Sequence, residues 1–277
     1  MLRQAKGLLM IRKISRMLAY RRLLRSGHPN LKVLRVTKQT HLHQAKRLHA
    51  EVYLENGYIE PGHIDANGTI SVEHDPYQSH ATYFVVVEMN GSEEQIVATA
   101  RQIHPKGKKG HASFPTMEKL KLENNVRKAI ESLDPMQCVE ISALAKRKGY
   151  SSFASFLIYR ALWQHSVRAQ HQLWLMACDA IYYNRLKFLF RDALMQIGEE
   201  TFYMGSRVIP AALEVDRSLD IMISNSRSLN PAQRLLHREY IRFFLEGLPT
   251  KYLKPHHLRA LNYSRGDEVL RDAVDEA

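Results

Sequence analysis

The chain has 277 residues and a mass of 32.1 kDa, with 45% hydrophobic and 25% charged residues. These proportions are ordinary for a globular protein of one large or two small domains, and they exclude a disordered or collagen-like chain. The most apolar stretch, Leu173 to Tyr183, contains Asp179 and falls short of the ~20 residues of a membrane-spanning helix. Two cysteines and the lack of a secretory signal pattern favour a cytoplasmic protein.

The charge is distributed in blocks along the chain. Residues 1–50 hold 13 lysines and arginines and no acidic residue, whereas residues 51–100 hold nine acidic residues and no lysine or arginine. Residues 101–150 hold 11 basic and five acidic residues. After position 50 the chain carries 27 positive and 28 negative groups, so its body is not a basic nucleic-acid platform. An acidic segment beside a basic one indicates a site that receives a cation on one side and an anion on the other.

Residues 1–27 are expected to form a basic helix or leader. Apolar positions such as Met10 and Ile14 fall on one side of a helical wheel. Such a segment suits adhesion to an anionic membrane surface or to an acidic protein, and the alternative is an unstructured leader. No nucleic acid is expected as a partner, because Tyr20 is the single aromatic residue among these charges.

The rest of the chain has an α/β pattern. Strands are expected at Leu31 to Thr37, Tyr83 to Met89, Gln95 to Ile103, Cys138 to Ala145, Leu173 to Cys178, Glu200 to Met204 and Val208 to Val215. Helices are expected at Thr40 to Leu54, Glu123 to Leu133, Phe153 to Gln170, Tyr182 to Leu194 and Pro231 to Leu245. Asn90-Gly91 predicts a hairpin. The elements predict a mixed central sheet flanked by helices in one domain at 28–226, followed by a C-terminal helix and tail at 227–277.

The loop after the strand at 138–145 combines features of a phosphate site. Lys146, Arg147 and Lys148 are followed by Gly149, which allows an unusual backbone turn. Ser151 or Ser152 can cap the helix that begins near Phe153, whose first N–H groups are unpaired and favour an anion. The loop could therefore receive a phosphate or a pantetheine amide, and the alternative is a plain basic loop before a capped helix.

Acidic residues at two places could act on an amine. Glu73 and Asp75 point the same way if their segment is extended, and paired carboxylates can hold an ammonium group and later accept its proton. Glu140 lies inside an otherwise apolar strand, and burial there would raise its pKa and suit it to general-base work. Arg101 could pair with these acids. The alternatives are a solvated loop for the first pair, a solvated strand face for Glu140 and a surface ion pair for Arg101.

Other familiar sites are absent from the sequence. No His-Glu-x-x-His and no Cys-x-x-Cys occurs, so no metal site is expected. The sequence also lacks the Gly-x-Ser-x-Gly of α/β-hydrolases, the Walker loop and the Gly-x-Gly-x-x-Gly fingerprint. Cys138 is expected to be a buried apolar thiol rather than a nucleophile. The lysines at Lys106, Lys108 and Lys109 could dock an acidic carrier protein or could simply be solvated.

Several short segments, in this order, resemble two related families. The earlier ones are similar to the acceptor-side motifs of acyl-homoserine-lactone synthases: residues 50–58, 73–77, 98–101, 114–115 and 139–142. The later ones are more similar to long-chain N-acyl amino acid synthases of the N-acyl-tyrosine synthase type: residues 184–188 and 205–210. Both families are variants of the GNAT acetyltransferase fold, so the resemblance implies an α/β, GNAT-like protein over roughly Leu34 to Asp216.

The resemblance implies transfer of a long fatty acyl group from acyl carrier protein to the amine of an amino acid. The donor would be an acyl-phosphopantetheine, on the carrier protein or on coenzyme A, and no permanently bound cofactor is implied. Glu140 would be the general base, Glu73 and Asp75 would shape the acceptor side, and Arg101 would tie the carboxylates together. Phe114 would line the acyl or acceptor pocket. The other substrate-binding positions implied are Tyr58, Ser142, Gly149, Tyr150 and Ser151.

The sequence also departs from the family patterns. Ala143 stands where the lactone synthases carry Arg, and Gln78 stands where their acidic motif ends in Asp. Both departures argue against S-adenosylmethionine as the acceptor. Ordinary acetyltransferases begin their donor loop with Arg or Gln, where this chain has Lys146. The alternatives to the acyl-carrier-dependent enzyme are an acetyl-CoA acetyltransferase and a membrane- or nucleic-acid-binding protein that acts through its basic N-terminus.

Overall fold

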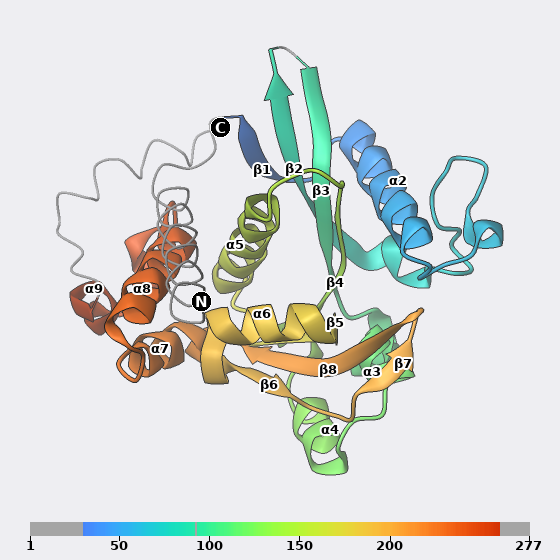
Figure 1. The fold of residues 1–277 in the computed structure, drawn as a ribbon. Helices are drawn as coiled ribbons and strands as arrows, with labels where there is room; N and C mark the ends of the chain where they lie inside the picture. Colours follow the sequence, from blue (N-terminus) through green and yellow to red (C-terminus); the bar gives the residue numbers. More distant parts are fainter. Residues whose placement is uncertain (1–29, 92, 261–277) are drawn as a thin grey trace, which may run out of the picture. The chain divides into compact units, whose positions relative to one another are not determined.

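A computed structural model describes residues 30–91 and 93–260 of the chain (Figure 1). These residues divide into two compact units, Asn30–Met222 and the residues from 223 onward. The predicted basic segment at 1–27 lies outside the described residues. The predicted domain limits at 28–226 and 227–277 stay a prediction. Among the helices described, none combines the length and the apolar character needed to cross a membrane.

The centre of the larger unit is an eight-stranded mixed sheet with the order β1-β2-β3-β4-β5-β8-β6, in which β7 also pairs with β8. Only β4 and β5 run parallel among the paired strands described. The strands are β1 (Leu31–Arg35), β2 (Ala81–Asn90), β3 (Glu93–Ile103), β4 (Cys138–Lys146), β5 (Leu173–Asp179), β6 (Leu194–Gln196), β7 (Thr201–Tyr203) and β8 (Ser206–Glu214). The mixed central sheet predicted from the sequence is confirmed.

Helices precede, connect and follow these strands. They are α2 (Gln39–Glu55), α3 (Pro115–Lys119), α4 (Asn124–Glu131), α5 (Phe153–Arg168), α6 (Ala180–Phe190), α7 (Val215–Ser226), α8 (Pro231–Leu245) and α9 (Pro255–Ala260). As predicted, Asn230 caps α8, and its side chain accepts a hydrogen bond from the backbone of Gln233 at 2.9 Å. Short 3-10 turns occupy much of the connecting chain, including Pro76–His80 and Gly107–Ser113.

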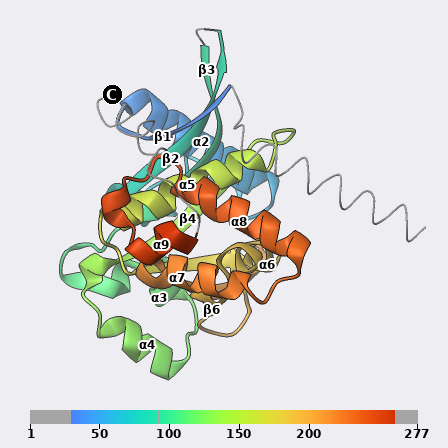
Figure 2. The ribbon, with the colours of Figure 1, turned by 90° about the vertical axis from the view of Figure 1, so that its left-hand side faces the viewer.

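Successive side chains of β2 point to opposite faces of the sheet. Helix α2 packs on one of these faces and α5 on the other (Figure 2). Tyr83, Val85 and Val87 pack with Ala45 and Leu48 of α2 in one buried cluster. Phe84 points the other way, and its ring lies 5.3 Å from that of His165 on α5. The sheet is therefore covered on both faces, which explains why β2 is a nearly continuous apolar run and why β3 is buried from Ile96 to Ile103.

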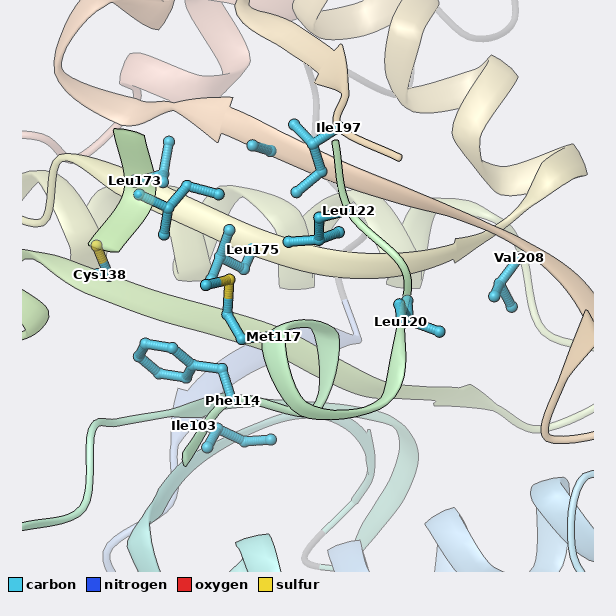
Figure 3. Close-up of a cluster of buried hydrophobic side chains, with 12 residues drawn as sticks. Ile103, Phe114, Met117, Leu120, Leu122, Cys138, Leu173, Leu175, Ile197 and Val208 are labelled. Atoms are coloured by element: carbon cyan, nitrogen blue, oxygen red, sulfur yellow. The ribbon is translucent and has the colours of Figure 1, made fainter. Parts of the chain in front are cut away.

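Strand β5 shows the same alternation in the second half of the sheet. Trp174 donates a hydrogen bond to Ser166 of α5 at 2.7 Å, and its ring lies 6.1 Å from that of Phe190 on α6. Leu173 and Leu175 point to the opposite face. They pack there in a hydrophobic cluster with Met117 of α3 (Figure 3). Helices α5 and α6 thus share one face, and α2 and α3 share the other.

The two parallel strands separate after a short common stretch. Residues Cys138–Glu140 of β4 pair with Leu173–Leu175 of β5, and no further ladder joins these two strands. Beyond this point β4 stays paired with β3, and β5 stays paired with β8. The register of β4 against β3 shifts nearby, where Ala143 has a φ of 55°. This bulge bends β4 at the point where the gap opens, as bulges do beside functional sites.

Several elements differ from the sequence-based prediction. The helix predicted to reach Leu194 ends at Phe190, where Arg191 adopts a φ of 54°, and the chain then enters β6. Helices α3, α7 and α9 were not predicted. The first is only five residues long, and the second follows β8 without a capping signal, so its start resembles a continued strand.

Candidate active site

A cavity of about 200 Å³ opens where β4 and β5 separate. Residues from both strands line it, including Leu144 on β4 and Met176 on β5. Tyr53 of α2 and Tyr159 of α5 also line it, although these helices lie on opposite faces of the sheet. The gap between the parallel strands therefore connects the two faces, which allows two molecules to meet from opposite sides.

Asp75 and Arg101 form a buried ion pair at the wall of the cavity. Arg101 donates to both carboxylate oxygens of Asp75, at 2.6 and 2.9 Å, and the residues are 5% and 6% exposed. Further donors of Arg101 reach the hydroxyl groups of Ser142 at 2.8 Å and Tyr83 at 3.2 Å. Burial opposes ionisation of Asp75, but the guanidinium outweighs it and holds the pKa of Asp75 below its ordinary value. The pair is therefore fixed and charged.

Glu73 does not share the surroundings of Asp75. Residues 72–74 form a turn instead of the predicted extended segment, and Pro76 begins a 3-10 turn directly afterwards. The backbone N–H of Asp75 bonds back to the carbonyl of Ser71 at 2.9 Å, which turns its side chain inward. Glu73 is exposed and is not among the residues that line the cavity. The expectation that the two carboxylates point the same way fails because the chain is not extended here.

Glu140 is a second buried carboxylate in the cavity wall, and it has no cation bound to it among the described residues. It is 1% exposed and accepts hydrogen bonds from the backbone N–H of Thr116 at 2.8 Å and from its hydroxyl at 2.9 Å. Burial raises the pKa of Glu140 to about 7, against the lowering effects of these two bonds and of Arg101. Near neutral pH this group can therefore hold or release a proton, which is what a general base requires.

Aromatic residues of α2 and the following loop form a wall beside the ion pair. His49 lies against the edge of Tyr53 with ring centroids 4.1 Å apart, and Tyr58 meets Tyr53 in the same way at 5.3 Å. All three line the cavity. His49 is 4% exposed, and its Nε2 has no hydrogen-bond partner among the described residues. Tyr58 was predicted as a substrate-binding residue, whereas His49 and Tyr53 were not.

The hairpin of β7 and β8 contributes Tyr203, Met204 and Ser206 to the cavity wall. Its tip, Gly205, lies directly on the backbone of Gly57, so that a Cβ atom there would come within 2.4 Å of the Gly57 carbonyl oxygen. Gly205 also has a φ of 73°, a conformation that favours glycine. The close approach of two backbones thus holds the hairpin against the loop that carries Tyr58.

The loop at residues 146–151 lies outside the cavity lining. Gly149 has the expected positive φ, 85°, and the hydroxyl of Ser151 accepts a hydrogen bond from the N–H of Phe153 at 3.2 Å. Two of the loop cations are paired, Arg147 with Glu51 and Lys148 with Glu55. The Tyr150 hydroxyl donates to Glu88 at 3.0 Å. The predicted roles of Gly149, Tyr150 and Ser151 in holding a donor remain predictions.

Phe114 and Ser142 have different surroundings from each other. Ser142 lines the cavity and accepts its hydrogen bond from Arg101. Phe114 is fully buried in the hydrophobic cluster of Figure 3, and its neighbour Pro115 lines the cavity instead. Phe114 therefore supports the start of α3, the helix that presents Thr116 to Glu140, rather than the cavity surface.

The cavity is lined by more acidic than basic side chains. Among the described lining residues, the carboxylates of Asp75, Glu140 and Asp179 face the single guanidinium of Arg101. Asp179 also caps α6 by accepting from the N–H of Ile181 at 2.9 Å. No three of the described lining His, Cys, Asp and Glu residues gather closely enough to hold a metal ion. A cationic group such as an ammonium is the ligand that this charge favours.

The fold is GNAT-like, with a mixed central sheet flanked by helices. The N-acyl amino acid synthase FeeM from uncultured soil microbes aligns with a TM-score of 0.50 and 14% identity, over 69% of this chain and 95% of FeeM. The acyl-homoserine-lactone (AHL) synthase LasI aligns with a TM-score of 0.50 and 16% identity, over 67% of this chain and 89% of LasI. The fold implied by the sequence resemblance is confirmed. No family model matches the sequence, and no curated protein does.

Proposed function

We propose that this protein is an N-acyltransferase that moves an acyl group from a phosphopantetheine thioester to an amine. The observation that carries the proposal is Glu140, a buried carboxylate with a pKa of about 7 in the wall of a cavity between two separated strands. A thioester is already activated, so such an enzyme needs chiefly to align two substrates and to remove protons. The shared fold of FeeM, described as an N-acyl amino acid synthase, supports the same reaction class.

The acceptor side of the cavity is proposed to be the side of α2. Asp75 with Arg101, His49, Tyr53 and Tyr58 gather there. The excess of carboxylates suits an ammonium group, which is the form in which most amines arrive at neutral pH. We propose an amino acid or a related amine as the acceptor.

The donor is proposed to enter between β4 and β5. Beyond Glu140 and Leu175 the facing edges of these strands have no ladder between them, so their backbone groups need other partners. The amide groups of a pantetheine arm can pair with a strand edge as an added strand does. Apolar lining residues such as Leu144, Met176 and Leu186 suit a fatty acyl chain, at about 0.8 kcal/mol per buried methylene. Acyl carrier protein is the proposed carrier of that arm.

The proposed reaction is a direct transfer of the acyl group from sulfur to nitrogen. Glu140, as the carboxylate, takes one proton from the acceptor ammonium, directly or through water. The free amine attacks the thioester carbonyl, so that a C–N bond forms and the C–S bond breaks. The intermediate loses a second proton. The departing thiolate takes up one of the two protons, and the other goes to solvent.

The test is an assay of the purified protein with acyl carrier protein or coenzyme A carrying chains from acetyl to palmitoyl, and with a mixture of amino acids and amines. We expect an N-acyl product by mass spectrometry, and a loss of kcat on the order of 100-fold or more in Glu140→Gln. Bacteria that express the chain should accumulate the same product in extracted lipids. The absence of any N-acyl product, or equal rates for wild type and Glu140→Gln, would contradict the proposal. A product with acetyl-CoA alone would assign an ordinary acetyltransferase.

A further inference from the structure

A histidine in the wall of the cavity has an unused hydrogen-bonding atom. His49 is 4% exposed, and its Nε2 has no hydrogen-bond partner among the described residues. Buried polar atoms of this kind are rare in native proteins, because leaving one unpaired is costly. Since His49 lines the cavity, a molecule bound there can supply the partner that the protein itself does not.

The imidazole of His49 is uncharged at neutral pH. Burial, and then the positive charge of Arg101, lower the pKa of His49 to about 3, against the opposing effect of Asp75. A neutral imidazole forms a single directed hydrogen bond at each nitrogen and does not make an ion pair. The group that it recognises therefore needs no charge of its own.

The imidazole of His49 packs in a row of aromatic rings. Tyr53 lies one helical turn after His49 on α2, with its ring at 82° to the imidazole and 4.1 Å away. Tyr58 in turn meets Tyr53 at 89°. Edge-to-face packing of this kind holds the rings in place, so Nε2 keeps its position relative to the ion pair of Asp75.

We propose that His49 determines the specificity for the acceptor, by hydrogen bonding through Nε2 to an uncharged polar group, a hydroxyl or an amide, on the acceptor amine. The inference rests on the proposed acyltransferase function. The ammonium of such an acceptor binds toward the carboxylates, and its polar group binds toward His49. An analogue without the polar group leaves Nε2 unpaired, so we expect discrimination of roughly 10- to 100-fold in kcat/KM.

The experiment compares pairs of acceptors that differ by one polar group: tyramine with phenethylamine, serine with alanine, and glutamine with norvaline. The proteins are wild type, His49→Leu, His49→Gln and the control His43→Leu, whose histidine is exposed on the same helix. In wild type and the control we expect a preference of at least about tenfold for the polar member of one or more pairs. His49→Leu is expected to reduce that preference to less than about threefold through the KM of the acceptor, with the KM of the donor unchanged. His49→Gln is expected to retain part of it.

Stability separates this role from a structural one. His49→Leu removes an unpaired buried polar atom, so its unfolding temperature should equal or exceed that of wild type. If it falls by several degrees instead, the preference is read from His49→Gln. The proposal is wrong if no pair is distinguished by wild type, or if both His49 variants keep the wild-type preference.

Failure of the proposed function would be visible separately, as a lack of transfer to every acceptor. The same pairs are therefore also measured by ligand-induced thermal shift, without a donor. Equal shifts by both members of every pair, or shifts in His49→Leu that match wild type, would overturn the assignment of His49 even without turnover. A selective shift that His49→Leu abolishes would support it.

Discussion

Asp75 and Glu140 are both buried carboxylates of one cavity, yet their surroundings move their pKa values in opposite directions. Arg101 binds both oxygens of Asp75 and lowers its pKa, whereas the partners of Glu140 are uncharged groups of Thr116, and its pKa rises to about 7. Burial raises the pKa of both groups, so the difference shows that a bound cation decides which carboxylate stays charged. The first is suited to hold structure and charge, and the second to exchange a proton.

The largest expected effect is a loss of stability when the ion pair between Asp75 and Arg101 is broken. Asp75→Ala leaves the guanidinium of Arg101 buried without its counter-charge, so we expect a loss of about 3–5 kcal/mol in the free energy of unfolding. Urea denaturation measures it. The matched control is Glu73→Ala, two residues earlier but exposed, with an expected change within about 0.5 kcal/mol. The double variant Asp75→Leu with Arg101→Met should recover much of the loss, and equal losses for the two alanine variants would show that the pair is not buried as described.

A smaller effect on stability is expected when Glu140 is replaced by an uncharged side chain. The pKa of Glu140 is higher in the folded protein than in the unfolded chain, so folding is favoured below the ordinary pKa of 4.5, and the contribution is lost as the pH rises through about 7. Glu140→Gln should therefore stabilise the protein at pH 8 by on the order of 2 kcal/mol relative to its effect at pH 4.5. Denaturant midpoints at the two pH values provide the measurement. A stabilisation that is independent of pH would mean that Glu140 does not titrate near neutrality.

The smallest expected effect is a shift of the pH profile when a hydrogen bond that lowers the pKa of Glu140 is removed. In wild type, kcat/KM should fall about tenfold per pH unit below pH 7, because the carboxylate form is the base. Thr116→Val removes the hydroxyl that donates to the carboxylate, so the profile should move upward by up to about one pH unit.

Thr99→Val is the control for this pH profile. Thr99 is equally buried, but its hydroxyl bonds to the carbonyl of Phe84 instead, and it does not line the cavity. Its profile should match wild type. A shift in Thr99→Val as large as that in Thr116→Val would assign the change to general loosening of the core.

Much of the fold follows from local patterns in the sequence. β-branched residues define β2 and β3, a short apolar run defines β5, and Asn90-Gly91 defines the turn between the first two. The burial of Glu140 was also accessible from the sequence, because an acid inside an apolar strand is unusual. The short helix α3 was not, since five residues are too few for a periodic pattern.

The parts of the site that the sequence concealed depend on long-range contacts. His49 lies on a helix that also carries the exposed His43 and the buried His41, so nothing local distinguishes it. The pairing of Arg101 with Asp75, 26 residues earlier, was expected, but the exposure of Glu73 was not, because it depends on the turn before Pro76. Phe114 resembles a pocket residue in its motif, but the direction of its side chain is set by the packing of α3 on β5.

The contact between Gly205 and Gly57 has a consequence for engineering. No side chain separates the two backbones, so each atom added at position 205 must push the hairpin away from the loop that carries Tyr58. A series from alanine through serine to valine at this one position would widen the enclosure in graded steps while leaving every charged group in place. Bulkier substrates could thus be admitted by adding material to the protein rather than by removing it.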